Sequence, residues 1–253
     1  MSETIRTRSE GRAAWLTLDR PPLNILDIAM MRELDAALEL AVAQSDFLVL
    51  QGAGAKGFSA GAEVADHVPE RVGEMLAAFH AVFRRLARAN CVTIAAVHGV
   101  CLGGGMELAT FCDFVVATPE AKFSQPEIKL GCFPPIALLT LPQLCGVRTA
   151  TDLILTGRTV DAAEACRLGL VSRVAEERQL AAGVESLLKE LRGLSADVLH
   201  LTRRMLWRLH AEEFERRLDE VERIYLNELM QTKDAQEGIR AFLEKRAPIW
   251  QNR

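Results

Sequence analysis

Three short apolar runs alternate with longer stretches of helical periodicity, and this alternation restricts the chain to a mixed α/β fold. The runs read DFLVL (46–50), VTIAAV (92–97) and DFVVA (113–117), and their composition is typical of buried strands. An earlier strand-like run, Ala13 to Leu18, stops before Pro21 and Pro22, because proline cannot donate to a strand ladder. We therefore expect strands that are separated by helices.

Helical patterns fill the intervals between these strands. Asp27 is a candidate N-cap of a first helix, and a second helical pattern covers about 70–88. Proline introduces the run IALLTLPQLCG, and helices are then expected at 149–155 and at 161–168, where Asp161 is the cap. A short strand at 170–174 should close this part of the chain.

The last part of the chain, from about Arg178 onward, is helical in pattern and richer in Arg and Glu. Its apolar stripe includes Leu199, Met205, Leu206, Leu209 and Phe214, and continues through Leu218, Val221, Ile224, Tyr225 and Leu229. In a chain of 253 residues this composition shift indicates one core with a helical appendage. A helical arm with such a stripe often packs on another subunit.

Composition and charge exclude several classes of function. The formal charge is −4 and basic residues are spread along the chain, so extended binding to a phosphate backbone is disfavoured. The N-terminus lacks the apolar segment of a signal peptide, and no apolar run reaches the roughly 18 residues of a membrane span, so we expect a cytoplasmic protein. The six cysteines form no C-x-x-C pair and are interpreted as reduced core residues. No ligand-spaced histidine cluster occurs, so no metal site is expected.

The loop after the 46–50 strand contains two patterns that mimic unrelated sites. Gly52, Gly54 and Gly57 fit G-x-G-x-x-G, and 57–61 fits the G-x-S-x-G nucleophile elbow around Ser59. A dinucleotide site should open straight into a helix, whereas more loop follows here. A hydrolase elbow needs its oxyanion glycines before the serine, whereas the glycine triplet comes after it. We interpret the loop as a turn lined by backbone.

The stretch HGVCLGGGMELATFCDFVVATPEAKFSQPEI combines a glycine triplet with two carboxylates. Gly103, Gly104 and Gly105 stand directly before a helical run. Amides at a glycine turn and at the positive end of a helix can hold an oxyanion, and Gly61-Ala62 can supply another donor. Two such donors on one acyl carbonyl would stabilise an enolate.

Enolate chemistry also needs proton transfers, and Glu107 and Glu127 are the candidates. In one apolar pocket, burial and mutual repulsion would push one carboxyl towards its neutral form, leaving one acid and one base. The alternative for Glu107 is a surface or helix-capping carboxylate, although its apolar setting MELATF is unusual for an exposed charge. The alternative for Glu127 is an ordinary loop acid. From the residues alone, a two-carboxylate enolate enzyme is one hypothesis among these.

Several motifs together resemble the crotonase (enoyl-CoA hydratase/isomerase) superfamily over nearly the whole chain. They are LTLDRPPLNIL, GFSAGAEV, AAVHGVCLGGGMELATFCDFVVAT, KFSQPEIKLG, LTGRTVDAAEACRLGLVSRV and DAQEGIRAFLEKRAPIW. The resemblance implies a spiral of ββα units with a C-terminal helical trimerisation region. It also implies an acyl-CoA substrate, a homotrimer or dimer of trimers, and no cofactor besides the coenzyme A that the substrate carries.

The same resemblance implies roles for the central residues. Ala62 and Gly104 would supply the two amides of an oxyanion hole. Glu107 and Glu127 match the catalytic glutamates of the hydratases, in which the first activates water at the β carbon and the second exchanges the α proton. Because both glutamates are present, hydration is favoured.

Coenzyme A contacts are implied at both ends of the chain. The backbone near Ala60 would take the adenine, and Phe242 and Lys245 match C-terminal positions that contact CoA, often from a neighbouring subunit. Glu63 and Ala65 replace the usual Asp and a basic residue after the oxyanion alanine, so the phosphate contacts do not follow from the resemblance.

A second departure lies after Glu127, where GCFPPIALLTLP replaces a glycine-rich segment. Together with LNILDIAMM, it is similar to the branch of cyclohexa-1,5-dienecarbonyl-CoA hydratases from anaerobic degradation of aromatic compounds. Phe133, Pro134 and Ile136 would then shape an acyl pocket that suits a flat alicyclic ring.

These expectations divide the chain into a core with the CoA and acyl site (1–190) and a helical region for oligomerisation and site closure (191–253). The alternatives are another crotonase reaction, such as double-bond isomerisation or ring cleavage, and a non-enzymatic RNA-binding protein. A serine hydrolase would require Ser59 as its nucleophile.

Overall fold

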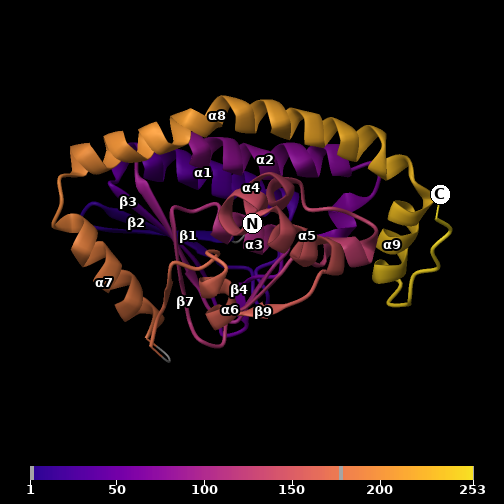
Figure 1. Cartoon of the computed structure of the whole chain (residues 1–253), viewed down its shortest axis with the longest axis horizontal. Coiled ribbons are helices and arrows are strands. Elements are labelled where there is room, and N and C mark those ends of the chain that lie inside the picture. The colour runs from indigo at the N-terminus through magenta and orange to yellow at the C-terminus, as the bar shows by residue number, and fades with distance from the viewer. Residues whose placement is uncertain (1–2, 177–178, 253) are drawn as a thin grey trace.

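Two β-sheets organise the protein, whose computed structural model describes residues 3–176 and 179–252, with the side chains of 208–211 outside the description (Figure 1). The larger sheet has the strand order β1 (Ile5–Glu10), β2 (Ala13–Leu18), β3 (Phe47–Gly52), β5 (Val92–Val97), β7 (Phe114–Ala117) and β10 (Arg173–Val174). Within this sheet β2, β3, β5, β7 and β10 run parallel to one another, and β1 pairs with β2 in the antiparallel direction. The smaller sheet contains β4 (Gly57–Ser59), β6 (Val100–Leu102), β8 (Lys122–Ser124) and the antiparallel β9 (Val160–Asp161).

A repeated unit builds both sheets at once. Strands β3, β5 and β7 each lead into a strand of the smaller sheet and then into helical structure. The helical elements are α1 (Ile28–Gln44), η1 (Val64–His67), α2 (Val72–Arg88), α3 (Gly104–Thr110), η2 (Pro126–Leu130), α4 (Pro135–Cys145), α5 (Val147–Thr156) and α6 (Ala162–Arg167). The predicted α/β class and the spiral of ββα units are confirmed.

Helix starts follow the capping residues seen in the sequence. The Asp27 carboxylate accepts the Met30 N–H at 2.8 Å, and Asp161 accepts the Glu164 N–H at the start of α6 in the same way. Both caps were predicted.

The apolar core lies on both faces of the larger sheet. Helices α1 and α2 pack together on one face, where they share a cluster with α3 and the smaller sheet. Helix α7 (Leu180–Arg192) covers the other face with Val184, Leu187 and Leu188. The central strands of the larger sheet are therefore buried on both sides, as their continuous apolar composition indicates.

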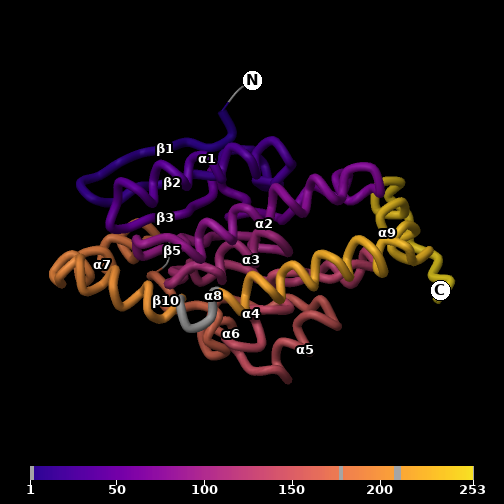
Figure 2. The backbone as a smooth tube through the Cα atoms, turned by 90° about the horizontal axis from the view of Figure 1, so that it is seen from above, coloured from indigo at the N-terminus to yellow at the C-terminus, as the bar shows by residue number. Residues whose placement is uncertain are grey.

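The C-terminal part is helical, as predicted, with α8 (Ala196–Asn227), η3 (Leu229–Gln231) and α9 (Lys233–Leu243). Helix α8 runs along α2 and α4 to reach α9 (Figures 1 and 2). Its apolar stripe divides: Phe214, Leu218 and Tyr225 are buried in the chain's own core, whereas Met205 and Leu206 are exposed. The side chain of Leu209 and the expected helix start at Arg178 lie outside the described residues. The boundary between 1–190 and 191–253 stays a prediction.

Several short elements differ from expectation. Strands β1, β4, β6, β8 and β9 were not predicted, because four of them have only two or three residues in glycine-rich or polar sequence and β1 is largely exposed. The strand predicted at 170–174 is wrong except for Arg173–Val174, since Leu170 and Val171 enter the core ahead of the ladder. Cys166 is exposed and Cys145 half-buried, so the core interpretation fails for these two thiols.

Within the described residues, no helix combines the length and apolar character needed to cross a bilayer. The cytoplasmic location stays a prediction.

Candidate active site

A cavity of about 500 Å³ lies where η1, η2, α8 and α9 meet the ends of β4 and β6. Its described lining includes Ala62, Gly104, Glu107 and Glu127, so the structure brings together the residues singled out in two distant stretches of sequence. Much of the remaining wall is apolar and includes Val64, Met75, Leu76, Phe79, Leu130 and Phe133.

Two backbone amides lie side by side at this cavity. A Cβ added to Gly104 would lie 3.4 Å from the Ala62 nitrogen and 2.8 Å from the Phe79 ring, so only glycine lets the two segments approach. Gly104 is the first residue of α3, where helix N–H groups have no intrahelical acceptor. Among the described hydrogen bonds neither the Ala62 nor the Gly104 N–H has an acceptor. Two free donors therefore converge at one edge of the cavity.

Glu107 is buried, with 2% of its surface exposed. Its Oε1 accepts the N–H groups of Ile136 and Ala137, both at 2.8 Å, at the start of α4. Burial raises the pKa of Glu107 to about 7, although these two hydrogen bonds work to lower it. The surface alternative is wrong. The carboxylate does satisfy helix N–H groups, but those of α4 rather than of its own helix.

Glu127 approaches the glycine triplet from η2. Its Oε1 is 2.6 Å from the place where a Cβ of Gly103 would stand, and Gly103 has φ of 51°, so this contact also depends on glycine. With its amide nitrogen oriented towards the carboxylate, Gln125 donates to both oxygens of Glu127 at 3.2 and 3.1 Å. Burial and then the negative charge of Glu107 raise the pKa of Glu127 well above its usual value.

This arrangement suits one kind of chemistry. Two amides can stabilise negative charge that develops on a carbonyl oxygen, and two carboxyl groups of unequal proton affinity can transfer protons beside it. Among the described residues neither glutamate forms a salt bridge with Lys or Arg, so neither is neutralised permanently.

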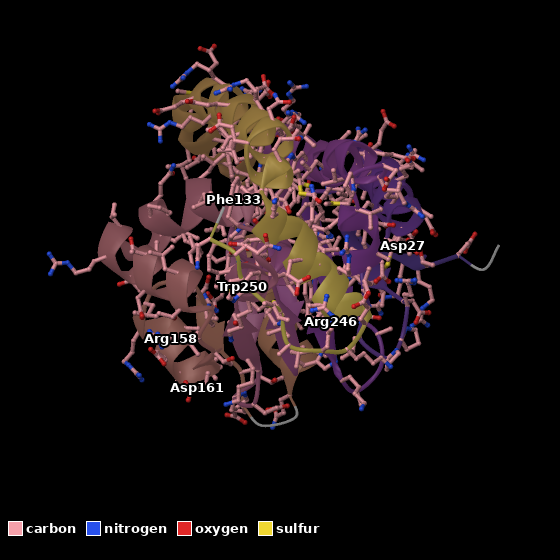
Figure 3. The ribbon with its side chains drawn as sticks, turned by 90° about the vertical axis from the view of Figure 1, so that its right-hand side faces the viewer. Asp27, Phe133, Arg158, Asp161, Arg246 and Trp250 are labelled. Carbon is pink, nitrogen blue, oxygen red and sulfur yellow. The ribbon has the colours of Figure 1, made fainter. Side chains whose placement is uncertain are left out.

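The predicted CoA-binding residues divide between cavity and surface. Ala60 and Phe242 line the cavity, and Phe242 is half exposed at its α9 edge. Lys245 is exposed and does not belong to the described lining. Arg246 lines the cavity instead and pairs with Glu237, and Figure 3 shows it with Trp250 on the α9 side. The CoA roles stay predictions.

Of the three residues predicted to form the acyl pocket, one lines the cavity and two do not belong to its described lining. Phe133 lines the cavity and meets the ring of Tyr225 edge to face, with centroids 5.0 Å apart. Pro135 lines it as well. The Ile136 side chain is packed in the core, and neither it nor Pro134 belongs to the described lining, so Ile136 reaches the site only through its N–H.

Sequence reasoning missed Gln125, Tyr225, His67 and Arg246. Gln125 stands two residues before Glu127, so its place beside that carboxylate could have been expected. Tyr225 and Arg246 come from helical segments whose periodicity reports only an apolar face. His67 lines the cavity, and its Nδ1 lies 3.0 Å from the Glu63 carbonyl oxygen.

Ser59 has a structural place. Its hydroxyl donates to the Asn24 carbonyl at 2.7 Å and accepts the Gly61 N–H at 3.1 Å, and the side chain is fully buried. A Cβ at Gly57 would overlap the Val100 backbone, so this glycine serves the crossing of β4 and β6. The loop is a turn that positions Ala62, and the hydrolase alternative is contradicted by the occupied hydroxyl. Among the described residues no group of three or more His, Cys, Asp and Glu side chains could hold a metal.

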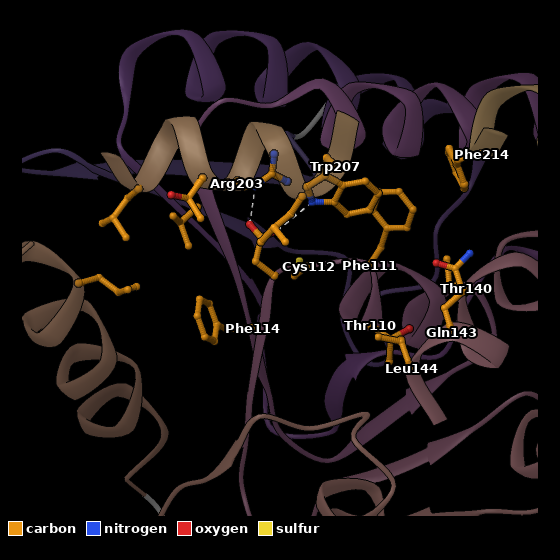
Figure 4. A pocket seen from close by; sticks show the side chains of 16 residues that line it. Thr110, Phe111, Cys112, Phe114, Thr140, Gln143, Leu144, Arg203, Trp207 and Phe214 are labelled. Carbon is orange, nitrogen blue, oxygen red and sulfur yellow. Dashed lines mark hydrogen bonds and ion pairs between the residues drawn. The ribbon is translucent and has the colours of Figure 1, made fainter. Parts of the chain in front are cut away.

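A second cavity of about 520 Å³ lies between α4, α7 and α8 (Figure 4), and neither glutamate lines it. Its polar centre is satisfied internally: the Asp113 carboxylate accepts from Arg203 at 2.6 Å and from Trp207 at 3.0 Å. Leu144 and Leu206 extend the lining to the exposed surface.

Comparison with known proteins identifies relatives over the full length. The model of the enoyl-CoA hydratase/isomerase family matches residues 8–253. The cyclohexa-1,5-dienecarbonyl-CoA hydratase of Thauera aromatica is 39% identical over 245 residues, which are 96% of this chain and 95% of the relative. A probable enoyl-CoA hydratase of Mycobacterium bovis is 39% identical over 258 residues, 99% of each chain. The solved carnitinyl-CoA hydratase of Mycobacterium avium superposes with a TM-score of 0.86 at 28% identity, covering 100% of both chains.

Proposed function

Because the chain belongs to the enoyl-CoA hydratase/isomerase family, we propose that it adds water to a cyclic conjugated dienoyl-CoA through a thioester enolate. The enzyme class is that of its relatives, a hydro-lyase of the enoyl-CoA hydratase type. One observation carries the mechanism: two carboxyl groups of raised pKa line the same cavity as two amides that have no acceptor among the described hydrogen bonds.

In this proposal the thioester oxygen sits between the N–H groups of Ala62 and Gly104. Attack at the end of a conjugated system pushes an electron pair onto that oxygen, and the two amides hold the charge. Because both donors are fixed by backbone and are free of other acceptors, they need little rearrangement during the reaction.

The glutamates divide the proton transfers. Glu107 is the base: it takes a proton from water as the oxygen bonds to the β carbon, or to the δ carbon of a dienoyl group. Glu127, whose pKa is raised by burial and by Glu107, holds the proton that is delivered to the α carbon (or the γ carbon) when the enolate collapses. One water is consumed, one C–O and one C–H bond form, and proton exchange resets the pair.

The coenzyme A moiety lies, in this proposal, along the α9 side of the cavity. Ala60, Phe242 and Arg246 line the cavity, the last as an ion pair with Glu237, while Lys245 stands on the exposed surface. No cofactor besides the substrate's coenzyme A is required by this chemistry.

A flat ring is the acyl group we propose, as part of aromatic-compound degradation. The name of the Thauera relative supports it, and so does the aromatic wall formed by Phe133 and Tyr225. Aromatic side chains contact a conjugated ring favourably by offset stacking or edge-to-face packing, so this wall suits a cyclic dienoyl group.

We also propose a homotrimer or a dimer of trimers, with 191–253 as the oligomerisation region. The exposed half of the α8 stripe, with Val198, Leu201, Met205 and Leu206, supports an apolar interface next to the second cavity. Light scattering on the purified protein measures the assembly; a monomer would contradict the proposal.

A screen of aliphatic, aromatic and alicyclic enoyl-CoA thioesters in oxygen-labelled water tests the function. Mass spectrometry should find one labelled oxygen in the product, and the cyclic dienoyl thioester should give the highest kcat/KM. A product that is isomerised but unlabelled would instead establish double-bond migration. A preference for straight chains would contradict the cyclic substrate while leaving hydration intact.

A further inference from the structure

The hydroxyl of Tyr225 is a polar group in the acyl part of the cavity that the two-glutamate mechanism does not use. Tyr225 is the single tyrosine of the chain and comes from α8, far in sequence from both glutamates. It lines the cavity, yet only 1% of the residue is exposed. A buried phenol normally has a hydrogen-bond partner, so the partner available to this hydroxyl decides its role.

Within the described part of the chain, the hydroxyl faces only a weak acceptor. Its side-chain partner is the Cys132 thiol, and that thiol already donates to the Leu130 carbonyl at 3.7 Å. The sulfur atom is therefore what the phenol proton faces, and sulfur is a poor acceptor. An oxygen atom that enters the cavity would be a better one.

The surrounding charge keeps the hydroxyl protonated. The pKa of Tyr225 is raised well above its usual value. Burial is the largest cause, and Cys132 and the charges of Glu127 and Glu107 add to it. Tyr225 lines the same cavity as both carboxyl groups, and among the described hydrogen bonds it reaches neither. All three side chains line one cavity of about 500 Å³, which is large enough to admit an oxygen-bearing group.

We propose that Tyr225 donates a hydrogen bond to the oxygen that hydration adds, first as water and then as the hydroxyl group of the product. This inference rests on the proposed hydration and names a third residue that contacts the reacting atoms. Tyr225 would hold the water so that a lone pair faces the acyl carbon while Glu107 takes the proton. The product hydroxyl would then keep the same donor.

Ligand pairs that differ only in that hydroxyl test the inference. Calorimetry on the full-length enzyme would compare 3-hydroxybutyryl-CoA with butyryl-CoA, for the wild type and for Tyr225→Phe. The phenylalanine keeps the ring contact with Phe133. We expect the wild type to prefer the hydroxylated ligand, and the variant to lose roughly five- to tenfold of that preference, with butyryl-CoA affinity unchanged.

Two further measurements separate this role from a structural one. If the hydroxyl only stabilised the packing of α8 against Cys132, Cys132→Ala would reduce the ligand preference as much as Tyr225→Phe does. We expect Cys132→Ala to keep the ligand preference. In turnover of crotonyl-CoA, Tyr225→Phe should lower kcat about tenfold with KM changed less than about threefold.

Three results would overturn the inference. They are no preference of the wild type for the hydroxylated ligand, an unchanged preference in Tyr225→Phe, or an equal loss of affinity for both ligands in that variant. Absence of turnover by the wild type on every thioester would instead refute the proposed hydration. The binding comparison would still report on Tyr225 in that case, so the two failures are distinguishable.

Discussion

Carboxyl groups that are wholly or partly buried occur in two contrasting regions of this molecule. At the interface of α2 and α8, Glu222 accepts from His80 Nδ1 at 2.5 Å and from Arg84 at 3.0 Å. Half-burial works to raise the pKa of Glu222, but the His80 hydrogen bond and the nearby charges lower it. In the cavity, Glu107 and Glu127 pair with no cation among the described residues, and their pKa values are raised.

The difference shows how one fold assigns carboxylates to separate tasks. A carboxylate beside a cation stays ionised and ties two helices together. A carboxylate held only by amide N–H groups, next to a second carboxylate, exchanges its proton near neutral pH. Burial and partners together separate the two kinds of group. Glu222 is half-buried and has His80 and Arg84 beside it, whereas Glu107 is almost fully buried and, among the described hydrogen bonds, is held only by amide N–H groups.

Neutralising one carboxyl group in each region should have opposite effects on activity and stability. Glu107→Gln and Glu127→Gln should each lower kcat by roughly 10²–10⁴-fold, because each removes one proton-transfer group. Steady-state hydration of the preferred thioester measures this.

Glu222→Gln is the matched control in the other region. It should keep kcat within about threefold of the wild type and lower the melting temperature, because His80 and Arg84 lose an ionised partner. Near-wild-type turnover in either cavity variant would refute the assigned roles.

Gly104→Ala tests the amides of the cavity. The added Cβ would lie 2.8 Å from the Phe79 ring and 3.4 Å from the Ala62 nitrogen, so the donors should be displaced. Loss of one such donor typically lowers kcat about 10²–10³-fold. Gly73→Ala, in α2, meets no atom within 4 Å and should leave kcat unchanged. Equal rates for the two variants would exclude an amide role for Gly104.

Ion pairs outside the cavity should contribute to stability but not to catalysis. Arg203→Met leaves the Asp113 carboxylate buried without its cation and should lower the free energy of unfolding by about 3–5 kcal/mol. Arg173→Met removes an exposed pair with Glu190 and should cost less than about 1 kcal/mol. Urea unfolding gives both values, and kcat per folded enzyme should change in neither.

The smallest expected effect is the pH dependence of the cavity pair. Below its pKa of about 7 Glu107 is protonated and cannot act as base, so kcat/KM should rise with pH up to that value. At higher pH the rate should fall again once Glu127 loses the proton it must donate, because its pKa is raised by burial and by Glu107. The rising limb should change about tenfold per pH unit. A flat profile between pH 5 and pH 7 would show that Glu107 is not the base.

The sequence predicts those strands and site residues that lie in one continuous stretch of recognisable pattern. Buried strands β3, β5 and β7 are apolar runs, and Gly104, Glu107 and Glu127 stand in one stretch. Strands β4, β6 and β8 have three residues each, too few to display a period, so the second sheet could not be predicted.

Tyr225 illustrates the remaining limit. Its helix reads only as an apolar stripe, and which half of that stripe faces the chain's own cavity depends on how α8 crosses α2 and α4. Ile136 was assigned to the acyl pocket from its bulk, whereas the structure uses its N–H. Backbone donors leave no mark in side-chain identity, so this contact could not be predicted from residue type.

The segment from Phe133 to Ala137 has one consequence for anyone who redesigns this enzyme. Phe133 and Pro135 line the cavity in which we propose that the acyl group binds, and the next two residues donate to the carboxylate that we propose as base. Selectivity and basicity are therefore coupled traits, carried by five consecutive residues. A substitution that trades one acyl group for another will also shift the pH optimum, and libraries in this segment should be screened at several pH values.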